Sequence, residues 1–275
     1  MQTSRPSGSY VSHLECSRSG DRVEHDQLHG LSASGAPLLV CYDLDRMKAD
    51  LDRDLICRRM ADMWMWREFL PLDAETQPVT LGEAITPLIP AGGGIMIKDE
   101  GRLPTGSFKA RGMAVAVSMA RHFGKTELAV PTAGNAGAAA AAYGAAANMN
   151  VHVFTPEDTP KVTVQEIGLH GADIYQVPGL IDACGKVVRA ITATETGWHD
   201  LSTLAEPYRL EGKKTMGLEL AFQFGWSLPD VIYYPTGGGT GFIGMWKAFQ
   251  ELRHLGWIDD KLPRMVSVQT HGCNP

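Results

Sequence analysis

Three short segments of the chain combine residue types that can do chemistry. They are KDEGRLPTGSFKARG (98–112), VPTAGNAG (130–137) and PTGGGTG (235–241). The first segment ends a constrained loop at Lys109, directly after Phe108. Most lysines are solvated surface charges, but a desolvated lysine amine is nucleophilic and forms Schiff bases with carbonyl compounds. Lys109 is therefore a candidate nucleophile, and the other two segments decide whether a carbonyl compound is expected beside it.

The glycine-rich segment is typical of a phosphate-binding loop at the start of a helix. Its residues are Gly237, Gly238, Gly239, Thr240 and Gly241. Glycine lets backbone N–H groups approach an anion closely, and a helix N-terminus adds the positive end of its dipole. A P-loop is excluded because no lysine follows the glycines.

Two other interpretations of this loop stay open beside a phosphomonoester site. The spacing of Gly239, Gly241 and Gly244 matches the GxGxxG dinucleotide pattern. That pattern predicts an acidic residue near the end of the next strand, where this chain has Gln269. The remaining interpretation is a purely structural turn. The phosphomonoester site is favoured, because it requires only the glycines and nearby threonine hydroxyls.

The middle segment also joins a predicted strand to a predicted helix. Asn135 and its neighbours form an ordinary turn and helix start when they are considered alone. In a binding site, Thr132, Ala133 and Gly134 would present backbone donors to an anion, and the Asn135 amide would bind a polar group. A Schiff-base lysine together with a phosphate loop suggests pyridoxal 5′-phosphate, whose phenolic oxygen needs a donor such as Asn135.

Elements that position these loops alternate between strands and helices. Strands are predicted at 37–44, 94–100, 127–131, 151–156, 173–178, 230–235 and 264–270, and helices at 45–70, 109–123, 135–149, 159–171, 180–196, 212–226 and 242–256. Prolines break the segment 70–90, which we interpret as a connector. This alternation predicts an α/β fold with a largely parallel sheet and helices on both faces. The three loops are then expected at the carboxyl ends of strands on one sheet edge.

Composition excludes several classes of protein. The 275 residues have a formal net charge of −6, a hydrophobic fraction of 44% and a charged fraction of 20%. This balance argues against an electrostatic nucleic-acid binder, and no apolar run is long enough to span a membrane. The first ten residues resemble a ragged cytosolic start, because they have no apolar signal-peptide core. Five scattered cysteines, including Cys273, favour reduced thiols in a cytoplasmic protein.

In their order along the chain, PTGSFKARG, TAGNAG and PTGGGTG resemble the fold-type II pyridoxal-phosphate enzymes, and most closely threonine synthase. Segments such as VSHLECSRSG, ITPLIP, EGKKTMGLELA and VQTHGCNP extend the resemblance over about residues 10–275. It implies that Lys109 holds the cofactor as a Schiff base and later moves protons, that Phe108 packs near the cofactor ring, and that Asn135 binds the phenolic oxygen. It further implies that residues 237–241 bind the phosphate. The substrate carboxylate would face Thr132, Ala133, Gly134 and Ser107, or Thr105.

The resemblance also implies a reaction and an assembly. A threonine synthase converts O-phospho-L-homoserine and water into L-threonine and phosphate, and a full-length chain would form a homodimer. The departing phosphate needs a cationic pocket, for which the candidates are Lys98, Arg102, Arg111, Lys161, Lys213 and Lys214. A threonine or serine dehydratase or a diaminopropionate ammonia-lyase shares the same motifs, and a non-catalytic homologue that binds a ligand or partner is a third possibility.

The chain departs from the family pattern at several positions. Leu103 and Ala110 replace the Asn and Asp that commonly flank the lysine motif. The N-terminal segment resembles a zinc ribbon in which only Cys16 remains, with Ser19, Leu31 and Ser34 at cysteine positions.

A metal site in this N-terminal segment has one candidate set, His13, Cys16, His25 and His29. A metal-free β remnant is favoured, because the central gap of that set is short for a zinc finger. The other histidines show no ligand spacing, and we expect no metal.

The family also has a Ser or Thr that contacts the pyridine nitrogen further along its chain, and no residue here takes that role. We therefore expect the 275 residues to be a C-terminally truncated piece of a longer enzyme. The predicted organisation is an N-terminal extension (1–60), a large cofactor-binding domain (61–112 plus 211–275) and a small domain (113–210).

Overall fold

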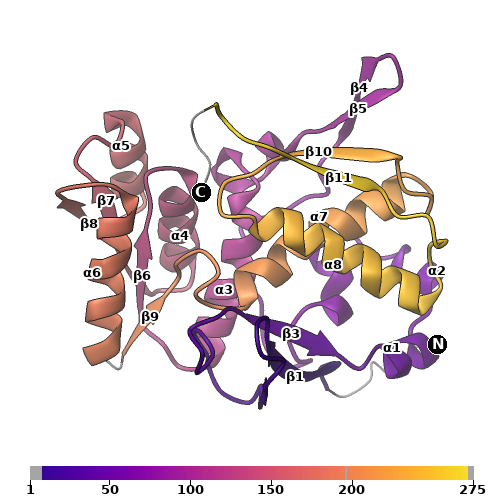
Figure 1. Cartoon of the computed structure of the whole chain (residues 1–275), viewed down its shortest axis with the longest axis horizontal. Helices are drawn as coiled ribbons and strands as arrows, with labels where there is room; N and C mark the ends of the chain where they lie inside the picture. The colour runs from indigo at the N-terminus through magenta and orange to yellow at the C-terminus, as the bar shows by residue number, and fades with distance from the viewer. Residues whose placement is uncertain (1–7, 196, 272–275) are drawn as a thin grey trace.

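The computed structural model describes residues 8–195 and 197–271, and the chain folds into an α/β structure with helices on both faces of a parallel sheet (Figure 1). The first residues, which we expected to be ragged, and Cys273 lie outside the described residues. Among the described helices, none is long and apolar enough to cross a membrane. The division into three domains stays a prediction.

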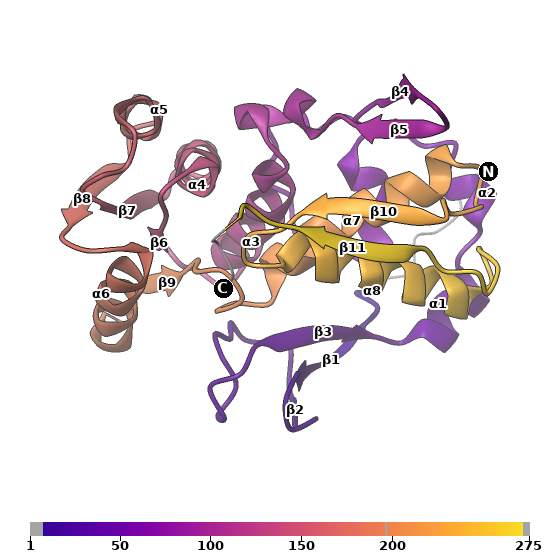
Figure 2. The same cartoon turned by 45° about the horizontal axis from the view of Figure 1, so that its top comes forward.

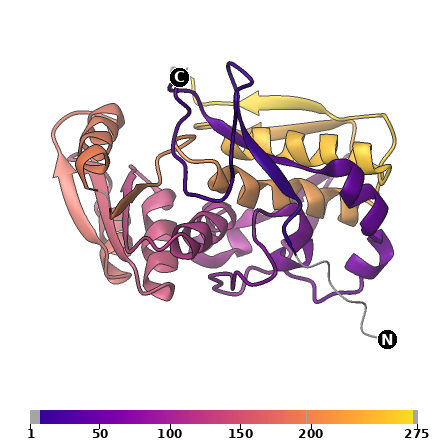
Figure 3. The ribbon, with the colours of Figure 1, turned by 90° about the horizontal axis from the view of Figure 1, so that it is seen from below.

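The N-terminal segment forms a three-stranded antiparallel sheet of order β2-β1-β3. Its strands are β1 (Val11–Cys16), β2 (Arg22–Val23) and β3 (Leu38–Tyr42). Alternate residues of β3 are buried, so Leu38, Val40 and Tyr42 point toward the core. Figure 3 shows this sheet lying across the two long helices at the centre of the molecule.

The predicted helix over 45–70 is wrong, because three short helices replace it. They are α1 (Leu44–Asp50), α2 (Arg53–Ile56) and the 3₁₀ helix η1 (Met63–Phe69). The carboxylates of Asp43, Asp52 and Asp62 each accept backbone N–H bonds at a helix start. Apolar spacing favoured one helix, but the capping aspartates begin new helices instead.

Residues 70–90 are not only a connector, because their end forms β4 (Leu88–Gly92). This strand pairs antiparallel with β5 (Ile95–Lys98), and the hairpin projects from the molecule in Figure 1. Gly92, Gly93 and Gly94 all have positive φ and allow the tight reversal. The chain then passes through the 3₁₀ turns η2 (Glu100–Arg102) and η3 (Pro104–Gly106) into α3 (Lys109–His122).

A four-stranded parallel sheet occupies one side of the molecule, in the order β8-β7-β6-β9. Its strands are β6 (Glu127–Pro131), β7 (Asn150–Pro156), β8 (Asp173–Val177) and β9 (Trp198–Asp200). Figure 2 shows α4 (Asn135–Ala146) and α5 (Lys161–Leu169) on one face and α6 (Ile181–Thr194) on the other. The short strand β9 was not predicted.

The other side of the molecule is built on two long helices, α7 (Tyr208–Gln223) and α8 (Thr240–Leu255). They pack closely, because a Cβ at Gly217 would lie 2.8 Å from the Cβ of Ala248. The strands β10 (Val231–Pro235) and β11 (Arg264–Val268) form a separate parallel pair against them (Figure 2).

The three candidate loops therefore do not share one sheet edge, and that expectation is wrong. One loop follows the β4–β5 hairpin, one follows β6 in the four-stranded sheet, and one follows β10 in the two-stranded pair. The turn at Gly92, Gly93 and Gly94 lets β5 pair with β4, which directly precedes it in the chain. The strand β5 is therefore part of neither parallel sheet.

Candidate active site

Lys109 is the first residue of α3, and a tight turn places it there. Thr105 and Gly106 both have left-handed backbones, with φ of 56° and 62°. This conformation is unfavourable for threonine, and such strain is often found at functional sites. The Lys109 Nζ lies 4.3 Å from the centroid of the Phe108 ring. Burial lowers the pKa of the Lys109 amine to about 8, and the charge of Arg209 adds to the effect.

Lys213 is a second amine over the same ring. Its Nζ lies 3.9 Å from the Phe108 centroid, and the whole residue is buried. This Nζ has no hydrogen-bond partner among the residues that the structure describes. Burial, together with the charges of Lys109 and Arg209, lowers the pKa of Lys213 well below its usual range. A second buried amine, whose charged form is disfavoured by burial and by neighbouring cations, therefore stands beside the candidate nucleophile.

A buried ion network fixes α3 against α7. The Arg111 guanidinium donates to Glu219 at 2.6 Å and to Glu100 at 2.7 Å. Lys98 donates to the same Glu219 at 2.7 Å. The network holds the helix that begins at Lys109, and it thereby positions that amine.

The structure separates the six cations that were predicted as candidates for the phosphate pocket. Lys98 and Arg111 pair with Glu219, Lys214 pairs with Glu211 and Glu251, Arg102 pairs with Asp99, and Lys161 is exposed at the start of α5. Lys213 is the candidate that lies beside Lys109.

Two glycines of the glycine loop, Gly238 and Gly241, have contacts that leave no room for a side chain. Gly239 has φ of +80° and stands directly before α8, whose N-terminus has no side-chain cap among the described residues. A Cβ at Gly241 would lie 2.0 Å from the Oη of Tyr234, and one at Gly238 would lie 2.3 Å from Thr203. Uncapped N–H groups beside bare backbone suit an anion.

The loop after β6 brings Thr132, Ala133 and Gly134 to the start of α4. The Thr132 hydroxyl donates to the Gly134 carbonyl and accepts from the Gly134 N–H, both at 3.1 Å. Asn135 is the first residue of α4 and is exposed. A Cβ at Gly137 would lie 2.7 Å from Thr132, so α4 packs directly on this loop.

The three loops meet although they come from different sheets. The Phe108 ring packs edge-on against Tyr234, with 5.8 Å between the centroids, and this contact joins the lysine loop to the glycine loop. The turn η3 contacts α4, which joins the lysine loop to the loop after β6. The three loops therefore lie near one another, although they do not share the sheet edge that the sequence predicted.

Several buried polar atoms at this junction have no hydrogen-bond partner among the described residues. Within the described ranges, four such atoms have no partner: Thr105 Oγ1, Ser107 Oγ, Lys213 Nζ and Tyr234 Oη. An unsatisfied buried polar atom costs about 1–3 kcal/mol, so several together indicate a site that is completed by another molecule. A reactive amine, a bare glycine loop at a helix start and orphaned hydroxyls fit a phosphorylated aldehyde such as pyridoxal phosphate.

Sequence reasoning missed Tyr234, Arg209 and Thr203. Arg209 acts on Lys109 from α7, a helix in which nearly every residue is buried. The sequence of this helix has charged residues on all of its faces. Such a pattern is found in helices that carry a buried ion network as well as in helices at the protein surface.

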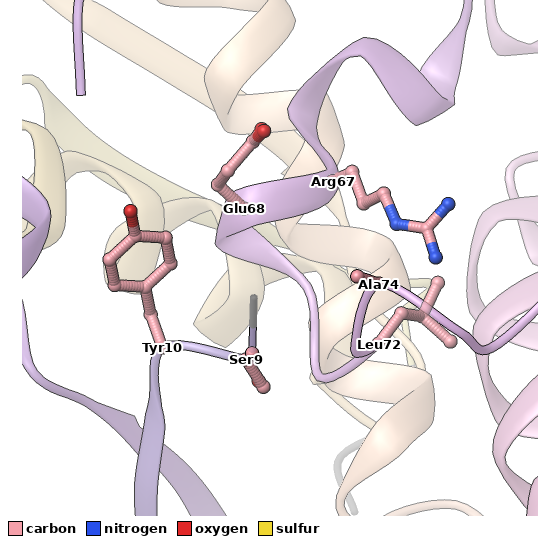
Figure 4. A pocket seen from close by; sticks show the side chains of 7 residues that line it. Ser9, Tyr10, Arg67, Glu68, Leu72 and Ala74 are labelled. Carbon is pink, nitrogen blue, oxygen red and sulfur yellow. The ribbon is translucent and has the colours of Figure 1, made fainter. Parts of the chain in front are cut away.

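Other parts of the molecule are separate from this junction. The predicted set of His13, Cys16, His25 and His29 is not brought together: the Cys16 thiol lies 3.2 Å from the Ser32 hydroxyl, and His29 Nε2 lies 2.8 Å from the Glu24 carbonyl. Figure 4 shows a hollow near the N-terminal segment, and its labelled side chains include Tyr10, Arg67 and Glu68. None of the residues predicted to bind the cofactor lines it.

The fold and this junction define a pyridoxal-phosphate enzyme. Residues 79–275 match the model of the family described as pyridoxal-phosphate dependent enzyme, and the chain belongs to this family. Membership implies pyridoxal phosphate as the cofactor.

Several relatives of the chain are threonine synthases. The threonine synthase of Methanosarcina acetivorans is 34% identical over 96% of this chain and 66% of its own length. That of Methanocaldococcus jannaschii is 31% identical over 94% of this chain and 66% of its own length, and that of Halalkalibacterium halodurans is 38% identical over 76% and 60%. The chain thus spans less than two thirds of the length of these relatives.

Solved structures show the same fold. A fungal L-serine ammonia-lyase from Rhizomucor miehei has a TM-score of 0.60 at 21% identity, and the match covers 72% of this chain and 62% of that one. A threonine deaminase from T.th. has a TM-score of 0.53 at 27% identity, and the match covers 64% and 54%. The first likeness concerns the fold alone.

Proposed function

We propose that the chain belongs to a threonine-synthase-type lyase, which converts O-phospho-L-homoserine and water into L-threonine and phosphate. The observation that supports this proposal is the desolvated Lys109 amine at the junction of the three loops. Two relatives whose sequences match most of this chain are named threonine synthases.

Each loop has a role in binding. Lys109 would hold the cofactor aldehyde, Phe108 would pack near its ring, and Asn135 would donate to its phenolic oxygen. The phosphate would lie on the N–H groups of Gly237, Gly238, Gly239, Thr240 and Gly241 at the start of α8. When bound, pyridoxal phosphate supplies an electron sink that stabilises negative charge at the substrate carbon.

The residues of the chain then act on the substrate. The Lys109 Nζ, with a pKa of about 8, would remove a proton from the α-carbon and later return it, and would move a second proton from the β-carbon to the γ-carbon. Thr132, Ala133, Gly134 and Ser107 orient the substrate carboxylate. The phosphate group leaves the γ-carbon with the electron pair of the C–O bond, and the hydroxyl of water adds at the β-carbon while the water's remaining proton goes to the phosphate. The N–H groups of the Lys213 amine, which is buried without a hydrogen-bond partner in the described structure, can donate to that phosphate.

A threonine or serine dehydratase is the second candidate. Its support is the likeness to a threonine deaminase at 27% identity. Both reactions use the same lysine and cofactor, and they differ in the leaving group.

Two measurements test these proposals in order. Addition of pyridoxal phosphate to the purified chain should produce the visible absorption band of a protonated Schiff base, and Lys109→Ala should abolish it. Phosphate release from O-phospho-L-homoserine then supports the synthase, and keto-acid release from threonine supports the dehydratase. A band without either turnover would favour a binding homologue, and no band with either protein would refute the enzymatic proposal.

A further inference from the structure

Three potential metal ligands gather on the outer face of the N-terminal sheet. His13 and Glu15 alternate along β1 and so share a face, while Leu14 and Cys16 point to the core. Cys41 on β3 is the register partner of His13. One ligand atom from each of His13, Glu15 and Cys41 lies within 4.8 Å of the other two.

The hydrogen bonds around His13 select the tautomer that binds metals. The Ser12 hydroxyl donates to the Cys41 carbonyl at 3.2 Å and also lies 2.9 Å from the Nδ1 of His13. With the hydroxyl proton directed at the Cys41 carbonyl, the Nδ1–H of His13 donates to the hydroxyl oxygen, and Nε2 retains its lone pair. Such a bond to the distal ring nitrogen commonly orients a histidine ligand.

The Nε2 of His13 is a buried atom without a hydrogen-bond partner in the part of the chain that the structure describes. Its neighbour is the Oε2 of Glu15, at 3.6 Å. Zinc binds N, O and S atoms at about 2.0–2.3 Å in tetrahedral sites, which places neighbouring ligand atoms about 3.3–3.8 Å apart. The separation between the imidazole and carboxylate is therefore already that of a shared ion.

We propose that His13, Glu15 and Cys41 bind a zinc-class divalent transition metal. Imidazole, carboxylate and thiolate together form a borderline-soft ligand set, which favours Zn²⁺ over Mg²⁺ or Ca²⁺. Three protein ligands leave a fourth position for water. Cys41 also lines a hollow between β3 and α8.

Two cations lie near the cluster, and neither blocks it. Arg22 approaches Glu15 to 3.8 Å, but its side chain is 71% exposed and can turn to solvent. Lys247 lines the same hollow as Cys41, and the Val40 carbonyl and Glu211 hold its ammonium. The site thus differs from the set of His13, Cys16, His25 and His29 that the sequence offers.

Metal titration of the full chain tests the proposal. Zn²⁺ should bind with one equivalent in competition with a chromophoric chelator, and Co²⁺ should give a thiolate-to-cobalt charge-transfer band. His13→Ala and Cys41→Ser should abolish both signals. The matched control is Cys16→Ser, which removes a thiol of the same strand that points to the opposite face and should leave binding unchanged.

A milder variant keeps the test decisive if a ligand substitution disturbs folding. Ser12→Ala retains all three ligands and removes the bond that orients His13 together with the bond to the Cys41 carbonyl, so the affinity for Zn²⁺ should fall about 10-fold. Less than one equivalent of bound metal in the wild type would overturn the proposal. Loss of binding in Cys16→Ser with retention in Cys41→Ser would also overturn it, and would assign the metal to the other set.

Discussion

Lys213 and Lys214 are adjacent and equally buried, yet only one of them is paired. The Lys214 Nζ lies 2.7 Å from Glu211 and 2.9 Å from Glu251. The Lys213 Nζ lies over the Phe108 ring and, within the described residues, has no hydrogen-bond partner. One lysine of α7 therefore belongs to the ion network of the core, and the other faces the candidate active site.

This difference predicts opposite effects of the same substitution. Lys213→Met should raise the free energy of unfolding by about 1–3 kcal/mol, because it removes an unsatisfied buried amine and keeps the side-chain volume. Lys214→Met should lower it by about 3–5 kcal/mol, because Glu211 and Glu251 lose a partner inside the protein. Urea denaturation at pH 7 measures both. Equal destabilisation by the two substitutions would show that Lys213 has a partner in solution.

The stability of the wild type should also depend on pH in a way that Lys213→Met reduces. The folded chain holds the pKa of Lys213 well below its usual range, whereas the unfolded chain protonates the amine below about pH 10.4. Between the two pKa values the unfolded state binds more protons, so the free energy of unfolding rises with pH up to about pH 10. Denaturation curves at several pH values should show a smaller rise for the variant.

The Lys109 amine should react as a base with a pKa of about 8. Acylation of Lys109, followed by mass spectrometry of its peptide in the absence of cofactor, should increase with a midpoint near pH 8. The control is the same protein unfolded in urea, where burial is lost and the midpoint should return to about 10.4. A folded-state midpoint that matches the unfolded one would show that the amine is solvated, and would remove the physical basis of its proposed role.

Much of the fold was predictable, because local patterns and the structure agree over most strands and helices. The prediction of one long helix over 45–70 was wrong because the capping hydrogen bonds of Asp52 and Asp62 begin new helices despite the apolar spacing. The capping residues and the apolar spacing are both visible in the local sequence. The site was predictable in its loops but not in its surroundings. Arg209 reaches Lys109 from a helix about a hundred residues away, and polar composition alone would place that helix at the surface.

The pairing of Arg111 with Glu219 should be essential for stability. Arg111→Met leaves the carboxylates of Glu219 and Glu100 without this partner and should cost about 3–5 kcal/mol. Arg102→Met is the control: it removes an arginine of the turn η2 that pairs with Asp99 at the surface, and it should cost less than about 1 kcal/mol. Similar costs for the two substitutions in chemical denaturation would contradict the network.

Two glycines of the phosphate loop separate a packing effect from a binding effect. Gly241→Ala places a methyl group 2.0 Å from the Tyr234 hydroxyl, so α8 or the ring must move, and the free energy of unfolding should fall by about 1–3 kcal/mol. A methyl group at Gly237 meets no described atom within 4 Å, so Gly237→Ala should fold with unchanged stability. Both variants should lose affinity for pyridoxal phosphate in absorbance titrations, because each added methyl group stands where the phosphate must approach the backbone. Gly237→Ala is the sharper test: wild-type affinity in this stable variant would place the phosphate away from the start of α8, and weakened binding there cannot be attributed to misfolding.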